Sequence, residues 1–253
     1  MERGYQHNFS EMVNGAMYDC SAREKKARTI LAIIEDFLAK PLSTLQILDV
    51  GSSTGIIDNY LADHFGMVAG IDIDSKAVDF AKNTFAKDNL EFKKADAMAL
   101  EFQENLFDIV ICTHIYEHVP DSQTLLNEIY RVLKPGGICY FAAGNRLSLM
   151  EPHYSLPFLS ILPRPLAHIY MRLAGKGNHY HEKHLTLTNL KKLVSSFVIH
   201  DYTKKIINSP DRYKAEYMLT PESLKHKTAK FIARYLYWLC PSYIWILEKP
   251  DTH

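Results

Sequence analysis

The sequence predicts an α/β fold, namely a doubly wound, mostly parallel sheet of seven strands with an insertion after the fifth strand. Three observations support this prediction. Short apolar runs alternate with stretches of helical periodicity between residues 45 and 143, a Pro-rich stretch follows, and two further apolar runs come after it. Such alternation is typical of βαβ units, because parallel strands need a helical crossover between them.

Each element follows from its own run of residues. The first predicted helix, 23–39, ends before Pro41, which cannot continue it. Ser75 is expected to cap the third helix, and the Pro135-Gly136-Gly137 turn precedes the fifth strand. The predicted strands are 45–50, 68–72, 90–94, 107–112, 138–143, 198–207 and 243–248, and the predicted helices are 23–39, 54–65, 75–86, 122–133, 188–196 and 222–239.

Composition excludes several classes of protein. Of the 253 residues, 47% are hydrophobic and 23% are charged, which is a globular composition and not that of a disordered or collagen-like chain. The formal net charge of zero argues against a protein that coats nucleic acid. Residues 1–140 hold 13 Lys and Arg against 21 Asp and Glu, whereas residues 141–253 hold 16 against 8. The two parts of the chain are therefore expected to have different functions.

The cysteines and the chain ends favour a cytoplasmic location. Cys20, Cys112, Cys139 and Cys240 form no C-x-x-C pair, which indicates a reducing compartment. The first residues show no signal-peptide pattern. The uncharged run at 235–247 has 13 residues, too few for a membrane-spanning helix.

A glycine-containing turn follows the first predicted strand. Gly51 comes directly after the strand, where it lets backbone approach a ligand closely, and ligands of open α/β sheets bind at this edge. Asp72 ends the next strand, where an acidic side chain accepts hydrogen bonds from ribose hydroxyls. A dinucleotide fingerprint would have glycine in place of Ser53 and Ile56, so an NAD-type oxidoreductase is the weaker alternative.

Five motifs occur in order along the chain: LDVGSSTG at 48–55, GIDID at 70–74, KADAMAL at 94–100, FDIVICTHIYEHVPD at 107–121 and LKPGG at 133–137. They resemble the motifs of the class I S-adenosylmethionine-dependent methyltransferases, a Rossmann-like family that includes methyltransferase type 11 and quinone-biosynthesis enzymes. The resemblance covers about residues 28–145.

The resemblance implies S-adenosylmethionine as the cofactor. The residues that would hold it, by position, are Asp49, Gly51, Ser52 and Gly55 for the methionine part, Asp72 and Ile73 for the ribose, Asp96 and Ala97 for the adenine, and Thr113 beside the sulfonium. The alternative is that Asp49 and Gly55 only shape the turn and that Asp96 caps a short helix.

Two histidines are the candidate catalytic residues, because a base of near-neutral pKa assists methyl transfer to a hydroxyl group. His114 follows the fourth predicted strand. His184 lies in HYHEKHLT at 179–186, a segment that borders the acceptor pocket in similar enzymes. A solvated loop is the alternative for His184.

We expect no metal. Some quinone-biosynthesis relatives carry E-x-x-E-H, similar to a divalent-metal site, where this chain has His114, Glu117 and His118. A metal at these three residues stays open as the alternative, since His and Glu are acceptable ligands. A structural role for the loop is favoured.

The chain is expected to form one methyltransferase domain over residues 1–253. Tyr5, His7, Phe9 and Tyr18 would contact the cofactor from a lid, and a disordered tail is the alternative. The expected parts are a helical lid at 1–40, a cofactor-binding core at 41–144, an acceptor-covering insertion at 145–186, and C-terminal helices with the last two strands at 187–253.

The expected acceptor is a small molecule or a lipid-like one. The basic second part of the chain favours an anionic acceptor. The apolar stretch 152–173 either lines the acceptor pocket, contacts a membrane peripherally or simply covers the sheet. No nucleic-acid partner is expected, and the oligomeric state stays open.

The sequence therefore predicts an S-adenosylmethionine-dependent methyltransferase. Oxygen is the favoured acceptor atom, because histidines crowd the predicted acceptor side. The alternatives are the NAD-type oxidoreductase and a non-catalytic partner protein that binds the cofactor.

Overall fold

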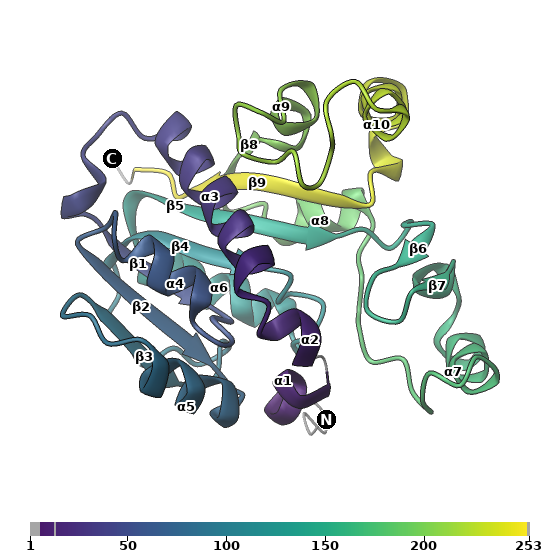
Figure 1. Cartoon of the computed structure of the whole chain (residues 1–253), viewed down its shortest axis with the longest axis horizontal. Coiled ribbons are helices and arrows are strands. Elements are labelled where there is room, and N and C mark those ends of the chain that lie inside the picture. The colour runs from purple at the N-terminus through teal and green to yellow at the C-terminus, as the bar shows by residue number, and fades with distance from the viewer. Residues whose placement is uncertain (1–5, 13, 252–253) are drawn as a thin grey trace.

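The computed structural model describes residues 6–12 and 14–251, and it confirms the predicted seven-stranded, mostly parallel sheet (Figure 1). The strands of this sheet are β1 Gln46–Val50, β2 Met67–Asp72, β3 Leu90–Lys94, β4 Phe107–Thr113, β5 Leu133–Gly144, β8 Val198–Asp201 and β9 Ser242–Glu248. Their order in space is β3-β2-β1-β4-β5-β9-β8. The pairs from β3 to β5 are parallel, whereas β9 runs antiparallel to both β5 and β8.

Helices cover both faces of the sheet. Side chains of α3 and α4 pack in one core cluster and those of α6 and α8 in another, on opposite sides of the strands (Figure 1). The helices are α1 Phe9–Met12, α2 Asn14–Met17, α3 Cys20–Phe37, α4 Ile56–Leu61, α5 Ser75–Thr84, α6 Ser122–Val132, α7 Arg164–Leu173, α8 Leu187–Leu193, α9 Thr203–Asn208 and α10 Leu224–Tyr235, with 3₁₀ turns at Gln6–Asn8, Leu42–Thr44, Leu159–Ile161 and Tyr237–Leu239. Among the described residues, no helix has the length and apolar character to cross a membrane.

Acidic side chains start two of the central helices. Asp74 caps α5 by accepting hydrogen bonds from the Lys76 and Ala77 amides, so the prediction that Ser75 is the cap was wrong by one residue. Asp121 caps α6 in the same way. An aspartate carboxylate accepts hydrogen bonds from the free amides of the first turn, and its negative charge suits the positive end of the helix.

The predicted strand 198–207 was wrong in its second half. The strand β8 ends at Asp201, whose side chain accepts a hydrogen bond from the Thr203 amide and starts helix α9. Two apolar residues of this helix, Ile206 and Ile207, are buried. The predicted helices 54–65 and 222–239 are also shorter in the structure, at Ile56–Leu61 and Leu224–Tyr235.

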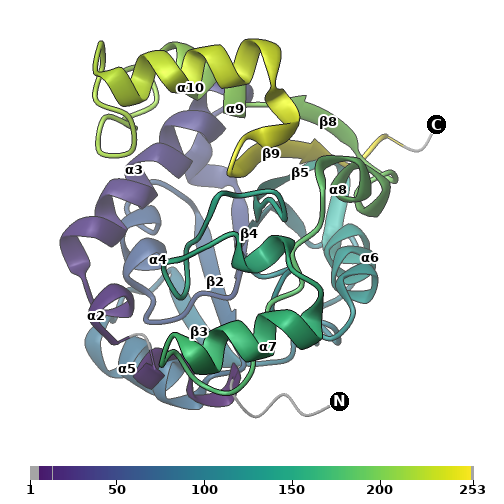
Figure 2. The ribbon, with the colours of Figure 1, turned by 90° about the vertical axis from the view of Figure 1, so that its right-hand side faces the viewer.

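Residues 145–186 leave the sheet after β5. They form the hairpin of β6 Met150–Glu151 with β7 Leu156–Pro157, followed by α7 and an extended return. Figure 2 shows α7 and this segment in front of the sheet, on the side toward which β5 runs. Their own small core holds five buried residues, Leu156, Leu159, Ala167, Met171 and Tyr180.

Candidate active site

The edge of the sheet where the chain direction reverses is the expected place for a ligand. Strand β1 lies between β2 and β4, and the chain moves outward in opposite directions on its two sides. Loops that leave the carboxyl ends of such strands separate and open a crevice. The candidate site is built from these loops.

The turn after β1 folds back on β2 through its backbone. The Gly51 and Ser52 amides both donate to the Ile71 carbonyl oxygen, at 2.8 and 2.9 Å. Gly51 has a φ of +88°, and a Cβ atom there would lie 2.1 Å from Ile115 Cδ1. Glycine is therefore the residue that fits this position without strain or displacement.

Gly55, by contrast, serves packing. It begins α4 with a φ of +72°, and a Cβ atom there would lie 2.5 Å from the Phe92 ring and 2.8 Å from Ala81. Gly55 does not line the cavity, so its place matches the alternative in which it only shapes the turn.

Asp72 joins two turns at the end of β2. Its Oδ2 accepts a hydrogen bond from the Ser53 amide at 2.8 Å, and its Oδ1 accepts one from the Asp74 amide at 2.9 Å. Burial raises the pKa of Asp72, and the hydrogen bonds from these amides oppose that rise. The carboxylate is thus held in one orientation beside the cavity.

Asp96 and Ala97 lie in the turn after β3. The Asp96 Oδ1 accepts a hydrogen bond from the Met98 amide at 3.0 Å, which fixes the turn. Both residues line the same cavity as Asp72. The first three loops of the sheet edge therefore meet one space.

This cavity has a volume of about 510 Å³. The predicted residues on its wall are Gly51, Asp72, Ile73, Asp96, Ala97, Thr113 and His114. Apolar side chains extend the wall toward β5 and β9, among them Ile30, Tyr140, Met218 and Ile244. Asp49, Ser52, Gly55 and His184 do not line it.

Asp49 and Ser52 lie behind the wall of the cavity. Asp49 is buried next to Asp58 of α4, and burial raises the pKa of both carboxyl groups. Two adjacent carboxyl groups in the interior favour holding a proton between them. Among the described residues, the buried Ser52 hydroxyl has no hydrogen-bond partner.

N-terminal residues cover the turns after β1 and β2. The Thr54 hydroxyl donates to the Met17 carbonyl oxygen at 2.7 Å, and the Ser10 amide donates to Asp74 Oδ2 at 2.8 Å. Phe9 lines the cavity. Residues of this N-terminal segment therefore lie next to the turns after β1 and β2.

The other residues expected in that lid have different places. Tyr18 packs its ring edge-on against Phe80, at 4.9 Å between centroids. His7 is exposed, and Tyr5 lies outside the described residues.

The two histidines chosen from the sequence have different surroundings. His114 lines the cavity with a side chain 47% exposed, and its Nδ1 lies 3.2 Å from Glu117 Oε1. His184 has a side chain only 3% exposed, and its Nε2 lies 3.4 Å from Glu151 Oε1. The structure therefore brings His114 to the cavity and places His184 behind it.

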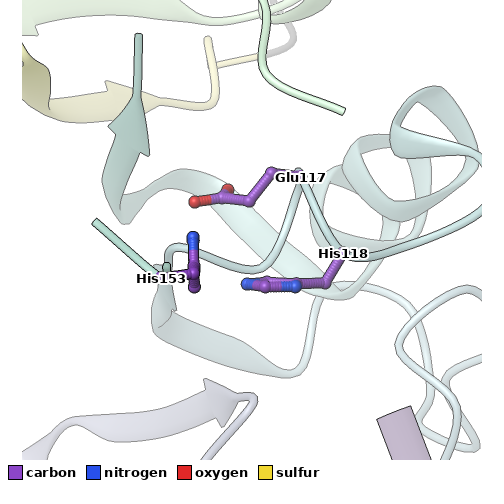
Figure 3. Close-up of side chains that lie close together, drawn as sticks. All are labelled: Glu117, His118 and His153. Carbon is purple, nitrogen blue, oxygen red and sulfur yellow. The ribbon is translucent and has the colours of Figure 1, made fainter. Parts of the chain in front are cut away.

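Sequence reasoning missed the pair Glu151 and His153. The His153 Nδ1 lies 2.7 Å from Glu151 Oε1, and His153 lines the cavity together with His118. Glu117, His118 and His153 face one another around a common space (Figure 3). Their signal in the sequence was Glu151-Pro152-His153 in a Pro-rich stretch, where no periodicity marks a functional residue.

Two buried carboxylates, Glu117 and Glu151, lie near His118 and His153 of the cavity wall. Burial would raise the pKa of Glu117, but His114, His118 and His184 outweigh it and hold the pKa at about 2. Glu151 is likewise held at a pKa of about 2, against the effect of burial, by His153 and His184. Among the described residues, Oε2 of Glu117 has no hydrogen-bond partner.

Two sets of side chains lie close enough together to hold a metal ion. Glu117, His118 and His153 form one, and Glu151, His153 and His184 form the other. Within the described part of the chain, His114 belongs to neither set, so the particular trio considered from the sequence is not assembled.

Sequence reasoning also missed one cavity residue near the turn after β1. Arg23 of α3 lines the cavity and is only 9% exposed, and among the described residues its Nε has no hydrogen-bond partner. Burial lowers the pKa of Arg23, and Asp49, Asp58 and Asp72 oppose this effect. Its helical position gave no local signal, because the packing of α3 onto the turns brings it there.

Comparison with known proteins is consistent with this geometry. A family model described as "Methyltransferase domain" matches residues 48–141. The ubiquinone biosynthesis O-methyltransferase of Coxiella burnetii is 34% identical over 102 residues, which are 40% of this chain and 44% of that protein. The enzyme of the same name from Hydrogenovibrio crunogenus is 29% identical over 190 residues, covering 73% and 74%.

A solved structure shows the same fold. The S-adenosylmethionine-dependent methyltransferase from Mesorhizobium loti superposes with a TM-score of 0.56 at 17% identity, covering 85% of this chain and 95% of the other. The chain spans less than half the length of the Coxiella burnetii relative that it matches.

The sheet order and the cavity at its reversal point define a doubly wound α/β protein. Residues 48–141, which span most of β1 to β5, match the methyltransferase-domain family, and the whole sheet has the fold of an S-adenosylmethionine-dependent methyltransferase.

Proposed function

We propose that this protein transfers a methyl group from S-adenosylmethionine to a small-molecule acceptor. The observation that carries the proposal is the single cavity that places the Asp72 carboxylate and the Gly51 backbone on the same wall as His114 and His153. One part suits a nucleoside, and the other offers groups that accept a proton. S-adenosylmethionine supplies an activated methyl group on a sulfonium, so the chain must mainly bind, orient and exclude water.

The loops after β1 to β3 would hold the cofactor. Asp72 has the place and charge to accept hydrogen bonds from ribose hydroxyls, and Asp96 and Ala97 border the space next to it. Gly51 lets the turn pack against Ile115 and adds no side chain of its own to the cavity wall. The buried Arg23 guanidinium offers donors for an anionic group of the methionine part.

The part of the cavity toward β5 and β9 would receive the acceptor. Ile30, Tyr140, Met218 and Ile244 make this wall largely apolar, which supports an acceptor with an apolar ring or chain. The imidazoles of His114 and His153 favour a hydroxyl oxygen as the methylated atom. The named relatives act in ubiquinone biosynthesis as O-methyltransferases, which supports the same choice.

A peripheral contact with a membrane is part of the proposal. Helix α7 exposes Leu166, Ile169 and Leu173, and Arg164 and Arg172 lie on the same helix. Apolar side chains combined with basic ones bind anionic lipid surfaces. The protein should therefore sediment together with anionic vesicles. The double variant Leu166→Ser/Leu173→Ser should remain in the supernatant.

Calorimetry tests the cofactor assignment. Titration with S-adenosylmethionine and S-adenosylhomocysteine should show binding of both, whereas NAD should neither bind nor compete. Binding of NAD alone, or binding of none of the three, would overturn the proposal. Binding of S-adenosylhomocysteine without methyl transfer to any acceptor would instead indicate the non-catalytic partner protein.

A further inference from the structure

The pair formed by Glu151 and His153 has the features of a catalytic dyad. The two residues lie on the hairpin after β5, and the His153 Nδ1 is 2.7 Å from Glu151 Oε1. The Glu151 side chain is fully buried, whereas that of His153 is 18% exposed and lines the cavity. One end of the imidazole is therefore held in the interior, and the ring reaches the space where an acceptor would bind.

The surroundings fix the orientation of Glu151. Its Oε2 accepts a hydrogen bond from the Tyr154 amide at 2.8 Å, and its Oε1 also lies 3.4 Å from His184 Nε2. An ionised carboxylate only accepts hydrogen bonds, so His153 must carry its proton on Nδ1. The lone pair of the neutral ring is then on Nε2, on the opposite side of the imidazole from Glu151.

A carboxylate holds one end of the His153 ring. The Nδ1 donates a hydrogen bond to Glu151 Oε1 at 2.7 Å, and the negative charge of Glu151 favours the protonated form of the imidazole. The imidazoles of His118 and His184 also face it, at 4.9 and 5.9 Å between ring centroids.

The other histidines near the cavity are less suited to accept a proton from an acceptor. Burial lowers the pKa of His118 to about 4, which makes it a weak base. His184 does not line the cavity. His114 is half-exposed, and its Nδ1 lies 3.2 Å from Glu117 Oε1, so the contact that would orient its ring is longer than the 2.7 Å contact between His153 and Glu151.

We propose that His153 is the general base of the methyl transfer and that Glu151 is its positioning residue. This inference rests on the proposed function, and it names a residue that the sequence analysis did not select. His153 Nε2 takes the proton of the acceptor hydroxyl as an oxygen lone pair forms the bond to the methyl carbon. The carbon–sulfur bond breaks, its electron pair stays on sulfur as a neutral thioether, and the imidazolium then releases its proton to solvent.

Histidine-selective ¹⁵N NMR of the protein with bound S-adenosylhomocysteine tests the assignment without any acceptor. The His153 signals are identified by their loss in His153→Asn. At pH 8 we expect a protonated Nδ1 and an unprotonated Nε2, with a pKa above 6.5 that falls in Glu151→Gln. The opposite tautomer, or a pKa that Glu151→Gln leaves unchanged, would overturn the proposal.

Methyl transfer to catechol gives a second measurement. The probe is a small phenol, and the readout is the rate at which its O-methyl product forms. His153→Asn should lower the rate about 100-fold, since a general base contributes at least that much. Affinity for S-adenosylhomocysteine should not change, because the proton-accepting end of the site does not hold the cofactor.

The positioning role has its own signature. Glu151→Gln keeps the shape and the hydrogen bond to Nδ1 but removes the charge, so the rate should fall about 10-fold. The acidic limb of the pH profile should also move to lower pH, because His153 then loses its proton more easily. A rate loss without a shift of this limb would indicate a merely structural role for Glu151.

The chain offers a matched control pair. His200 Nε2 lies 2.8 Å from Glu248 Oε2 on strands β8 and β9, and neither residue lines the cavity. His200→Asn and Glu248→Gln should leave the rate within about twofold. Equal losses in the two pairs would overturn the special role of His153.

Three outcomes separate the base assignment from the proposed function. If S-adenosylhomocysteine does not bind, the function itself fails. If it binds but His153 has the wrong tautomer, only the base assignment fails. A rate that a chelator abolishes and a divalent metal restores would also overturn the base assignment, because a metal would then activate the acceptor. The NMR spectra decide the assignment whether or not catechol is methylated.

Discussion

The two ends of the cavity are built in different ways. At the end proposed for the cofactor, short turns after β1, β2 and β3 are joined by the backbone amides of Ser53, Asp74 and Ala95, which all donate to Asp72. At the end proposed for the acceptor, the loop after β4 meets a segment after β5, and the buried carboxylates of Glu117 and Glu151 both lie close to His153.

The difference indicates how strongly each end should respond to a single substitution. The cofactor end depends on one backbone conformation and one carboxylate, so a single substitution should remove most of its affinity. At the acceptor end, several carboxylates and imidazoles share their charge. Removing one of them shifts protons among the rest, and the effect of a single change is spread over the cluster.

The largest effect at the cofactor end is expected for Asp72→Ala. Loss of the carboxylate should weaken S-adenosylhomocysteine binding about 100-fold, because a hydrogen bond to a charged group is worth about 1.5–3 kcal/mol. Calorimetry measures the loss, and Asp79→Ala on the exposed face of α5 is the control. Equal affinity in the Asp72→Ala and wild-type proteins would contradict this account of the cofactor end.

Gly51→Ala should have the next largest effect. The left-handed backbone and the 2.1 Å approach to Ile115 Cδ1 should cost about 1–3 kcal/mol of stability and also weaken cofactor binding. Gly175 has a φ of +65° with open space around it, so Gly175→Ala measures backbone strain alone. If urea unfolding shows the same loss of unfolding free energy in both variants, the close approach to Ile115 does not contribute to the effect of Gly51→Ala.

Asp58→Asn tests the buried acids beneath the cofactor turn. Burial raises the pKa of Asp58 well above 3.8 and that of its partner Asp49 to about 7. Groups with raised folded-state pKa values stabilise the fold at low pH, and this contribution is lost as the pH rises from about 4 to 7. The amide that replaces the Asp58 carboxyl group would donate a hydrogen bond to Asp49, so the variant should be more stable than wild type by about 1–2 kcal/mol at pH 8.

Thermal unfolding across pH measures this effect. The advantage of Asp58→Asn should shrink toward pH 5, where the wild-type pair holds its protons. Asp88→Asn, at an exposed position, should not change the pH profile. A variant that is less stable than wild type at pH 8 would show that the second carboxylate is required there.

The smallest effect is expected for His184→Asn at the acceptor end. His184 is one of two imidazoles near Glu151 Oε1, and His153 is the closer one. Its loss should leave the raised pKa of His153 in place and should lower methyl transfer less than 10-fold. If the pKa of His153 falls as far as in Glu151→Gln, the two imidazoles act as a unit and the contrast with the cofactor end becomes sharper.

Several of the residues that the sequence assigned to the cofactor do line the cavity, because the information that places them is local. Strand β3 was predicted at its observed bounds, and Gly51, Asp72 and Asp96 follow their strands as the spacing indicated. Each of these residues is recognisable from a few neighbours. Ser52 was chosen by position in the motif, but the turn directs it into the interior instead of the cavity.

The acceptor end could not be predicted in the same way. Glu151 and His153 lie in a segment without helical or strand periodicity, and Glu117 approaches them only when β4 and β5 pair. Helix α9 was missed for a related reason. Its apolar residues fit a strand pattern equally well. The Asp201 side chain favours the helix, because it accepts a hydrogen bond from the Thr203 amide at the helix start.

The loop after β4 and the segment after β5 are tied to each other by the backbone. The Lys183 amide donates to the Glu117 carbonyl oxygen at 2.8 Å, and the Leu185 amide donates to the Tyr116 hydroxyl at 3.0 Å. Exchanging residues 145–186 with those of a relative would therefore transfer only one of the two segments that form this wall of the cavity, without the loop after β4. To transplant acceptor preference between such proteins, both stretches must be exchanged together as one matched unit.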